Sequence, residues 1–508
     1  MLANILSGAL IGIDAYPVEV EVDVAQGLPQ FSTVGLPEGA VKESKDRVKS
    51  AIKNSGYDFP VRRITVNLAP ADIRKDAASL DLPMALGILA ATGIVGEKAR
   101  RYLYMGELSL DGRIKAVRGT LAVAAAAKDW NLDGLILPQD NAAEGAAVQG
   151  LPVYPVENLA QVVMFLNDET ALCAFSEPSP PITASLCHEE NFSEVCGQQH
   201  AKRALEVAAA GGHNMLMVGP PGSGKTMLAR RVPTILPQLD FNEALETTKI
   251  HSVSGLLGQH EALIRQRPFR APHHTISDAG LIGGGSIPRP GEVSLSHNGV
   301  LFLDELPEFR KNVLEMLRQP LEDGQVVISR AALSLTYPAD FMLVAAMNPC
   351  QCGFLGDSHH ACHCTPQQLQ RYRMRLSGPL LDRIDLHIEV PRVHHQDLID
   401  NQSGESSETI RRRVELARQV QRERFHKHQL FTNAQMQSRH IRTFCALNSE
   451  GEQLLAQVTQ RLGLSARSYG RILKVARTIA DLSGEQNILQ PHLAEAIQYR
   501  SLDRPQRH

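Results

Sequence analysis

The chain has 508 residues, which predicts roughly three domains at about 150 residues each. Lys and Arg number 52 against 55 Asp and Glu, a net charge of −3 that excludes a uniformly basic nucleic-acid coat and an acidic disordered tail, but not a local basic channel. Hydrophobic residues at 43 % and charged residues at 21 % are typical of a globular protein. Aromatic residues at 5 %, with Trp130 the single tryptophan, argue against a carbohydrate cleft or a strand binder built on stacked rings.

Apolar runs and cysteines indicate the compartment. No apolar run reaches the roughly 18 residues that a membrane helix needs, and the N-terminus lacks the positive region of a signal peptide. Eight cysteines in so long a chain do not make a disulfide framework. We therefore expect a cytoplasmic protein without membrane contact.

Composition along the chain predicts an α/β fold in three blocks. Residues 1–168 mix helical stretches with strand-like alternation of valine and acid at 18–24. A run of Pro and Ser predicts a linker at 169–190. Residues 191–395 alternate short apolar runs with helical stretches, which predicts parallel strands with crossover helices. Residues 396–508 predict a helical lid.

A phosphate-binding loop follows the apolar run at 215–218, a predicted strand. The loop consists of Gly219, Pro220, Pro221, Gly222, Ser223, Gly224, Lys225 and Thr226. Its glycines let backbone N–H groups turn toward the β-phosphate, and the next helix adds its dipole. Lys225 supplies a positive charge to the β- and γ-phosphates, and Thr226 a hydroxyl ligand for Mg²⁺. The loop therefore predicts ATP and Mg²⁺ as cofactors, in preference to a simple glycine turn.

Polar residues end two further predicted strands. The run at 300–303 leads into Asp304 and Glu305. Asp304 is predicted to orient Mg²⁺ and Glu305 to polarise the attacking water as general base. An Asp-Glu pair at the end of a strand is by itself equally consistent with a helix N-cap. Together with the phosphate-binding loop, it favours a role in ATP hydrolysis. The run at 342–346 leads to Asn348, whose amide is suited to hold the lytic water.

Four of the cysteines lie within fifteen positions and form a predicted metal site. They are Cys350, Cys352, Cys362 and Cys364. Four thiolates from two such turns suit a tetrahedral Zn²⁺ with a structural role, because no position is left open for water. The neighbouring alternative ligands are His359, His360 and His363. The competing interpretation is a polar loop with four reduced thiols.

Three longer segments, residues 267–274, 291–305 and 375–383, resemble magnesium-chelatase-like AAA+ ATPases, and the nearest group is the YifB/ComM family. The resemblance covers essentially the whole chain. It implies a hexameric ATP-dependent DNA helicase that promotes branch migration of recombination intermediates, as in natural transformation. The implied partners are single-stranded or branched DNA, further copies of this chain in a homohexamer, and recombination proteins.

The resemblance also implies roles for three arginines. Arg383 matches the arginine finger that acts across the subunit boundary, and its planar charge suits a developing γ-phosphate; the alternative is a surface ion pair with Asp382 or Asp385. Residues 465–477 match the sensor-2 helix, with Arg467 the first choice and Arg471 the second for the phosphate sensor. A solvated basic face is the alternative there.

A predicted β-hairpin at 321–336 precedes the sensor-1 strand. In related replicative helicases a hairpin at this place presents a basic residue to DNA inside the ring. Arg330 fits that position, where a cation contacts phosphate rather than reading bases. The alternative is an ordinary hairpin on the surface of the domain.

The first block resembles the Lon protease domain through residues 74–83 and 105–114. That family uses a Ser-Lys dyad. Ser79 matches the nucleophile, but Leu121 stands where the lysine is expected, and Lys115 is a poor substitute. We therefore predict a peptidase-inactive domain used for assembly or nucleic-acid contact, with Ser79 a helix cap or turn residue.

The tail helix at 411–424 is rich in arginine, and residues 396–508 carry 17 basic and 12 acidic residues, a net +5. A solvated face is slightly favoured over a DNA patch. Three rival functions stay open: a metal-chelatase motor subunit acting on a partner, an ATP-dependent peptidase, and a non-enzymatic ATP switch.

Overall fold

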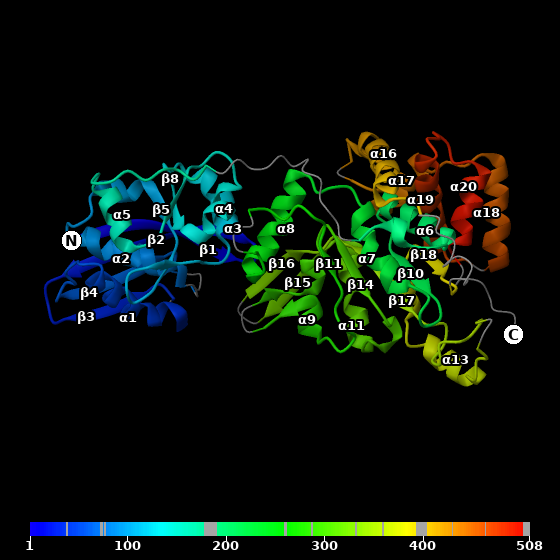
Figure 1. The fold of residues 1–508 in the computed structure, drawn as a ribbon, viewed down its shortest axis with the longest axis horizontal. Helices are drawn as coiled ribbons and strands as arrows, with labels where there is room; N and C mark the ends of the chain where they lie inside the picture. The colour runs from blue at the N-terminus through cyan, green and yellow to red at the C-terminus, as the bar shows by residue number, and fades with distance from the viewer. Residues whose placement is uncertain are drawn as a thin grey trace. The chain divides into compact units, whose positions relative to one another are not determined.

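The computed structural model describes residues 1–36, 39–71, 75, 78–176, 190–258, 262–285, 288–330, 333–357, 360–392, 404–428, 430–462 and 464–500. The chain divides into two compact units, Met1–Ala184 with Phe241–Arg265, and Ser185–Asp240 with Gln266–His508. Both are mixed α/β, and the second ends in a bundle of helices, which confirms the predicted fold class (Figure 1).

A seven-stranded mixed sheet in the order β3-β4-β2-β1-β5-β8-β9 forms the centre of unit 1. Its strands are β1 (Leu2–Ile11), β2 (Asp14–Ala25), β3 (Gln30–Val34), β4 (Arg63–Ala69), β5 (Tyr102–Tyr104), β8 (Gly134–Pro138) and β9 (Val153–Val156), beside a small pair, β6 (Glu107–Leu108) and β7 (Ile114–Lys115). On β2 the valines are buried while Glu19 and Asp23 are exposed, the alternation expected of a pleated strand.

Helices cover both faces of this sheet. They are α1 (Gly39–Asn54), α2 (Asp81–Ala91), α3 (Thr120–Ala127), α4 (Ala142–Ala146), α5 (Leu159–Leu166) and α8 (Phe241–Ser254). Successive residues of β8 enter different cores, because side chains alternate along a strand: Ile136 packs in the core with α1, α2 and α5, and Leu135 in the core with α3 and α4.

Helix α8 belongs to unit 1, although the sequence places residues 241–265 inside the block 191–395. Its Leu245 packs into the same apolar core as α3. A buried polar contact fixes the helix as well, because the Ser252 hydroxyl donates to the Glu144 carboxylate and accepts from the N–H of Gly119 at 3.0 Å. A segment of the second block is thus an integral part of unit 1.

The central sheet of unit 2 is fully parallel, in the order β11-β14-β17-β10-β18. Its strands are β10 (Met215–Val218), β11 (Phe269–Arg270), β14 (Val300–Leu303), β17 (Met342–Met347) and β18 (Leu386–Glu389). All side chains of β10, β14 and β17 are buried, as expected of strands covered on both faces. The three apolar runs predicted from the sequence are the three central strands.

The helices of unit 2 fall into a core set and a C-terminal set. The core set is α6 (Gln199–Gly211), α7 (Lys225–Ile235), α9 (Asp278–Ile282), α10 (Glu292–Leu295), α11 (Lys311–Met316), α12 (Arg318–Asp323), α13 (Pro366–Arg373) and α14 (Gly378–Leu381). The C-terminal set is α16 (Ser407–Phe425), α17 (Ser438–Phe444), α18 (Ser449–Leu462), α19 (Ala466–Leu482) and α20 (Gln490–Gln498). Helices α16 and α19 pack against α6 in one apolar core with the sheet (Figure 1).

Two short antiparallel pairs complete unit 2. They are β12 (Gly283–Gly284) with β13 (Arg289–Pro290), and β15 (Gln325–Arg330) with β16 (Leu333–Pro338). The second pair is the hairpin predicted before the third core strand, and buried Tyr337 joins it to the first pair through a 2.8 Å hydrogen bond from its hydroxyl to the carbonyl of Pro288. Within the described residues, every helix is too short or too polar to cross a bilayer.

Candidate nucleotide site

The phosphate-binding loop lies at the carboxyl end of β10, between the ends of β17 and β18. Parallel sheets bind ligands at such ends. Gly222 and Gly224 have φ of 76° and 85°, left-handed values that favour glycine. A Cβ at Gly219 would meet the carbonyl oxygen of Val390 at 2.2 Å, so that position also needs glycine. The local backbone therefore explains the glycine spacing.

Lys225 begins α7 and folds its ammonium back over the loop. Its Nζ donates to the carbonyl oxygens of Gly219 at 2.7 Å and Pro220 at 2.9 Å, and to Oδ1 of Asn348 at 3.3 Å. Burial lowers the pKa of Lys225, an effect that Asp304 opposes. The structure thus brings together the lysine, the loop and the amide at the end of β17.

Thr226 and the two acids after β14 form the adjacent part of the site. The Thr226 hydroxyl donates to Oδ2 of Asp304 at 2.7 Å, and the N–H of Glu305 donates to Oδ1 of Asp304 at 2.9 Å. A hydroxyl beside a carboxylate is an oxygen donor set that Mg²⁺ prefers. In the loop, the buried Ser223 hydroxyl has no hydrogen-bond partner among the described residues, as a phosphate ligand would require. These residues fit ATP with Mg²⁺.

A cavity of about 270 Å³ opens beside these acids and contains a residue that the sequence did not single out. Its lining includes Thr226, Arg230, Asp304, Glu305 and His274. Nδ1 of His274 lies 3.3 Å from Oε2 of Glu305, and the His274 ring packs against His273, with centroids 4.1 Å apart. Segment 267–274, used above only for a resemblance, therefore supplies a contact to the predicted general base.

Gln198 is a second residue that the sequence reasoning missed. Its Nε2 donates to the carbonyl of Ser223 at 2.6 Å, although the two residues are 25 positions apart. Gln198 has φ 51° at the start of α6, and its Oε1 is buried without a hydrogen-bond partner among the described residues. Nothing in its sequence neighbourhood marks it, because the contact arises from the packing of α6 beside the loop.

Arg383 is almost completely buried in the single chain. Its guanidinium donates to the carboxylate of Glu322 on α12 and to the carbonyl of Pro379 at 2.5 Å. The alternative interpretation, an ion pair within the chain, is therefore right in kind, but the guanidinium is buried and its partner is Glu322, 61 residues away. Asp385, one of the two expected partners, is engaged by His213 and Arg471.

The two sensor-2 candidates on α19 differ in environment. Arg467 is exposed, with neither an ion pair nor a hydrogen bond among the described residues. Arg471 pairs with Asp385, whose other oxygen lies 2.9 Å from Nδ1 of the buried His213. Burial lowers the pKa of Arg471 to about 10, with the charge of Arg500 adding to the effect. Arg471 thus links the lid helix to the core, while Arg467 stays available to a ligand.

The β15–β16 hairpin carries the residue predicted to contact DNA. Arg330 ends β15 and pairs with Leu333 across the hairpin. The Arg330 side chain and residues 331–332 at the tip lie outside the described part of the chain. The hairpin is confirmed, and the contact of Arg330 with DNA stays a prediction.

The four clustered cysteines converge. Their sulfur atoms all lie within 4.8 Å of one another, and Sγ of Cys350 is 3.3 Å from that of Cys352 and 3.7 Å from that of Cys362. The backbone N–H of Phe354 lowers the pKa of Cys352 to about 6, which favours a thiolate there. The sulfur atoms thus match the donor set of a tetrahedral site.

The neighbouring histidines contribute less to this cluster. The His360 ring stacks on Phe354 with centroids 4.9 Å apart, and its Nδ1 lies 3.9 Å from Asp357. His363 is exposed, and His359 lies outside the described residues. The described geometry therefore favours the four sulfur atoms as the ligand set.

Ser79 lies in a short 3₁₀ turn, Ala78–Leu80, directly before α2. It is not the cap of that helix, because Leu80 holds the N-cap position. Leu121 is fully buried, and its N–H donates to Oε1 of Glu144 at 2.9 Å. Lys115, the substitute considered for the missing lysine, is exposed.

The phosphate loop follows an inner strand of a parallel sheet, and a hydroxyl–carboxylate pair and a further acid lie at the end of another inner strand. This arrangement defines a P-loop ATPase core of the AAA+ class. Three family models agree. "Magnesium chelatase, subunit ChlI" matches residues 191–398, "Subunit ChlI of Mg-chelatase" residues 20–141, and "Magnesium chelatase, subunit ChlI C-terminal" residues 404–500.

Similar proteins extend over the whole chain. Competence protein ComM of Haemophilus influenzae is 46 % identical over 508 residues, 99 % of this chain and 98 % of that protein. The uncharacterized protein YifB of Escherichia coli is 45 % identical over 505 residues, 99 % and 98 % of the two chains. The magnesium-chelatase 38 kDa subunit of Rhodobacter capsulatus is 26 % identical over 228 residues, 41 % of this chain and 61 % of that protein.

The chain therefore belongs to the YifB/ComM family of magnesium-chelatase-like AAA+ proteins. Membership implies ATPase activity with ATP and Mg²⁺, and an oligomeric AAA+ assembly.

Proposed function

We propose that this protein is a hexameric, ATP-driven DNA helicase that promotes branch migration or remodels recombination intermediates, as in natural transformation. The observation that carries the proposal is the assembled nucleotide site, in a chain similar over its full length to a competence protein. The expected partners are single-stranded or branched DNA and recombination proteins, and the expected compartment is the cytoplasm.

Each residue of the site has a distinct task in hydrolysis. Lys225 moves from the loop carbonyls to the β- and γ-phosphates, which explains why its ammonium has only neutral partners. Thr226 and Asp304 hold Mg²⁺, which supplies positive charge to the phosphate oxygens. Glu305 accepts a proton from the attacking water, and Asn348 orients that water.

Ring assembly gives Arg383 its role. We infer that Arg383 acts as the arginine finger on the nucleotide of a neighbouring subunit. In the single chain its charge is held by Glu322, so this role requires the pair to open when two subunits meet. The side chain of Glu322 is half exposed while that of Arg383 is 9 % exposed, so a phosphate that takes the place of Glu322 meets a nearly buried guanidinium. Arg467, exposed on α19, is the proposed sensor within the same chain.

Force on DNA is assigned to the β15–β16 hairpin, with Arg330 contacting the backbone. A cation at the end of a hairpin strand binds phosphate without reading sequence. We therefore expect DNA binding that is weakly sequence-selective and strongly dependent on salt.

Two further assignments concern parts outside the nucleotide site. We propose that Cys350, Cys352, Cys362 and Cys364 bind one structural Zn²⁺, supported by their convergent sulfur atoms. We also propose that the N-terminal block, residues 1–168, is a Lon-like domain without peptidase activity. Support comes from Leu121, whose buried apolar side chain offers no proton acceptor in place of the expected lysine.

The second candidate is a motor subunit of metal-chelatase type that acts on a protein partner. It is favoured by the three magnesium-chelatase family models that match this chain. The two functions differ in what stimulates hydrolysis: DNA accelerates a helicase, whereas a chelatase motor responds to its protein partner alone.

The deciding experiment is ATP turnover with no DNA and with single-stranded, duplex and forked DNA, alongside unwinding of a labelled fork. We expect stimulation by single-stranded and forked DNA, and unwinding that requires ATP hydrolysis. The Lys225→Ala variant is the control, since loss of the ammonium weakens nucleotide binding and stops both activities. Turnover indifferent to every DNA, with no unwinding, would reject the helicase.

A further inference from the structure

The most basic helix of the sequence is largely neutralised in the structure. Helix α16 contains the arginine run at 411–413, yet five of its six arginines have carboxylate or carbonyl partners, and Arg422 is the exception among the described residues. The ion pairs are Arg411–Glu415, Arg412–Glu408, Arg413–Glu405 and Arg424–Asp481. Arg418 donates to the carbonyl of Ala209 at 2.9 Å. Most of the positive charge on α16 is therefore compensated by partners within the chain, which argues against this helix as a nucleic-acid site.

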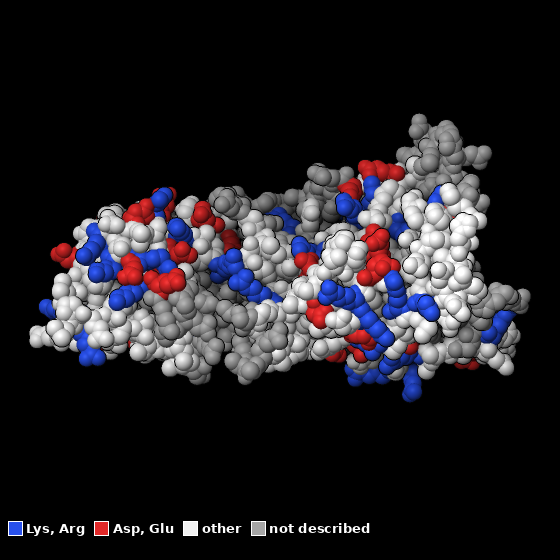
Figure 2. Space-filling model, turned by 90° about the horizontal axis from the view of Figure 1, so that it is seen from below, with Lys and Arg blue, Asp and Glu red and all other residues white. Residues whose placement is uncertain are grey.

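A different group of cations surrounds a cavity of about 450 Å³ between the turn after β14 and helix α13. Lys311 lies at the start of α11, Arg371 on α13, and Arg375 just after it; we call these three residues and the space between them the basic pocket. In the described part of the chain, Lys311 and Arg371 are exposed and have no carboxylate partner. Seen from below, Lys and Arg side chains form groups on the surface of the molecule, with Asp and Glu side chains among them (Figure 2).

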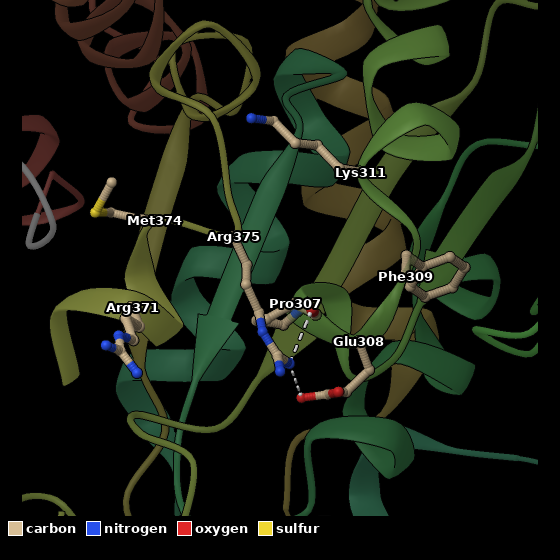
Figure 3. A pocket seen from close by; sticks show the side chains of 7 residues that line it. All are labelled: Pro307, Glu308, Phe309, Lys311, Arg371, Met374 and Arg375. Carbon is tan, nitrogen blue, oxygen red and sulfur yellow. Dashed lines mark hydrogen bonds and ion pairs between the residues drawn. The ribbon is translucent and has the colours of Figure 1, made fainter. Parts of the chain in front are cut away.

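The basic pocket has the features of a phosphate site rather than of a packing defect. Figure 3 shows Lys311 and Arg371 on either side of Arg375, with no dashed line to either of the first two. Glu308 is the single carboxylate among the lining residues, so the pocket has an excess of positive charge. The Met374 side chain is exposed beside them and provides an apolar surface suited to a sugar or base.

Arg375 connects this pocket to the catalytic turn. Its guanidinium donates to Oε1 of Glu308 at 2.6 Å and to the carbonyl of Pro307 at 3.4 Å. The side chains of Arg375 and Glu308 are 44 % and 42 % exposed, so their ion pair is weak, and a phosphate competes with the carboxylate for the guanidinium. Glu308 lies three residues after Glu305, and its N–H donates to the carbonyl of Glu305 at 2.7 Å.

We propose that the basic pocket binds the phosphodiester backbone of a nucleic-acid strand, through Lys311, Arg371 and Arg375, and that binding releases Glu308 and thereby adjusts Glu305 for hydrolysis. The inference deepens the proposed helicase function and rests on it. It assigns the nucleic acid a second contact, separate from the hairpin and adjacent to the turn that carries the predicted general base.

The test uses the full-length chain and a fluorescent single-stranded oligonucleotide. The variant Lys311→Gln with Arg371→Gln removes two cations that have no part in the nucleotide site, and Lys45→Gln with Lys53→Gln is the matched control on α1, where both lysines are exposed. Each phosphate contact with a single strand contributes about 0.7 to the slope of log affinity against log salt concentration. Loss of two contacts should therefore make that slope shallower by about 1.4. At 0.1 M salt this corresponds to about 25-fold weaker binding of the oligonucleotide.

ATP turnover provides the second readout. Without oligonucleotide, we expect the double variant in the pocket to hydrolyse ATP at the wild-type rate. With oligonucleotide, its turnover should not increase, whereas the turnover of the α1 control should increase as in the wild type. Glu308→Gln should act in the opposite direction, with higher strand-free turnover and tighter strand binding, because the competing carboxylate is gone. A pocket that only supports the fold cannot give opposite signs for the two variants.

The outcomes separate this inference from the function on which it rests. If the wild-type chain binds no strand, the helicase proposal fails and this one fails with it. If the wild-type chain binds and the pocket variant matches it in affinity and salt slope, the pocket assignment alone is wrong. Loss of assembly by the pocket variant in light scattering would identify the pocket as a contact between subunits and also overturn the proposal.

Discussion

At the scale of single residues, the turn after β14 gives two adjacent acids different contacts. Glu305 has φ 52°, a left-handed value that a residue other than glycine rarely adopts and that costs on the order of 1–3 kcal/mol. This conformation directs Asp304 toward Thr226 and Glu305 toward His274. Asp304 is hydrogen-bonded to the Thr226 hydroxyl and Glu305 lies beside the His274 imidazole, which agrees with their proposed roles as metal ligand and general base.

Replacing Glu305 by Gln tests that separation. Glutamine keeps the size of the side chain but accepts no proton, so turnover should fall on the order of a hundredfold while ATP stays bound. Single-turnover hydrolysis and binding of a fluorescent ATP analogue measure the two properties. The control is Glu315→Gln, which removes a surface carboxylate paired with Arg318 and should leave the rate unchanged. Wild-type turnover in Glu305→Gln would contradict the assignment.

The sequence predicted those site residues that lie in one string or at the ends of apolar runs. The loop, Asp304 and Asn348 follow buried strands, and parallel topology brings such ends together. The contact between Glu322 and Arg383 was not predictable in this way, because no local pattern joins residues 61 positions apart. Gln198 and His274 were not predicted for the same reason, because tertiary packing brings them to partners that lie far away in the sequence.

At the scale of elements, sequence periodicity predicted where helices and strands occur, but not which other elements they pack against. The parallel strands and the hairpin were predicted, since apolar runs and turns are local properties. Helix α8 was placed inside the second block, because a local sequence pattern does not say which neighbour a helix packs against. Its placement in unit 1 depends on Glu144, a residue about a hundred positions before Ser252. Likewise, Arg413 and Arg424 on α16 pair with Glu206 and Asp481, two carboxylates that lie far away in the sequence.

The cysteine loop gives a prediction for one element. A Zn–S distance of about 2.3 Å places tetrahedral ligands about 3.8 Å apart, and three of the sulfur pairs lie 3.3 to 3.7 Å apart. We expect one zinc per chain by elemental analysis of protein purified under reducing conditions. Replacing all four cysteines by serine should remove it, whereas Cys173→Ser with Cys196→Ser, a pair outside the cluster, should not. Metal-free wild-type protein would disprove the site.

At the scale of the whole molecule, the proposed nucleotide site of the single chain does not include Arg383. Lys225, Thr226 and the two acids converge at one end of the sheet. Arg383 is instead bound to Glu322, with its backbone fixed between α14 and β18. Under the proposed function, a neighbouring subunit receives this guanidinium and provides its own. On that proposal, ATP hydrolysis requires the ring to form.

Mixing two inactive variants tests that requirement. Lys225→Ala loses its own nucleotide site but keeps its finger, and Arg383→Ala keeps its site but lacks the finger. If the subunit contact is head-to-tail, random mixing in equal amounts pairs an intact site with an intact finger at roughly a quarter of the contacts. We therefore expect each variant alone to be nearly inactive, and the mixture to regain up to about that fraction of wild-type turnover. A mixture as inactive as its components would place the function of Arg383 within its own chain, where Glu322 already holds it.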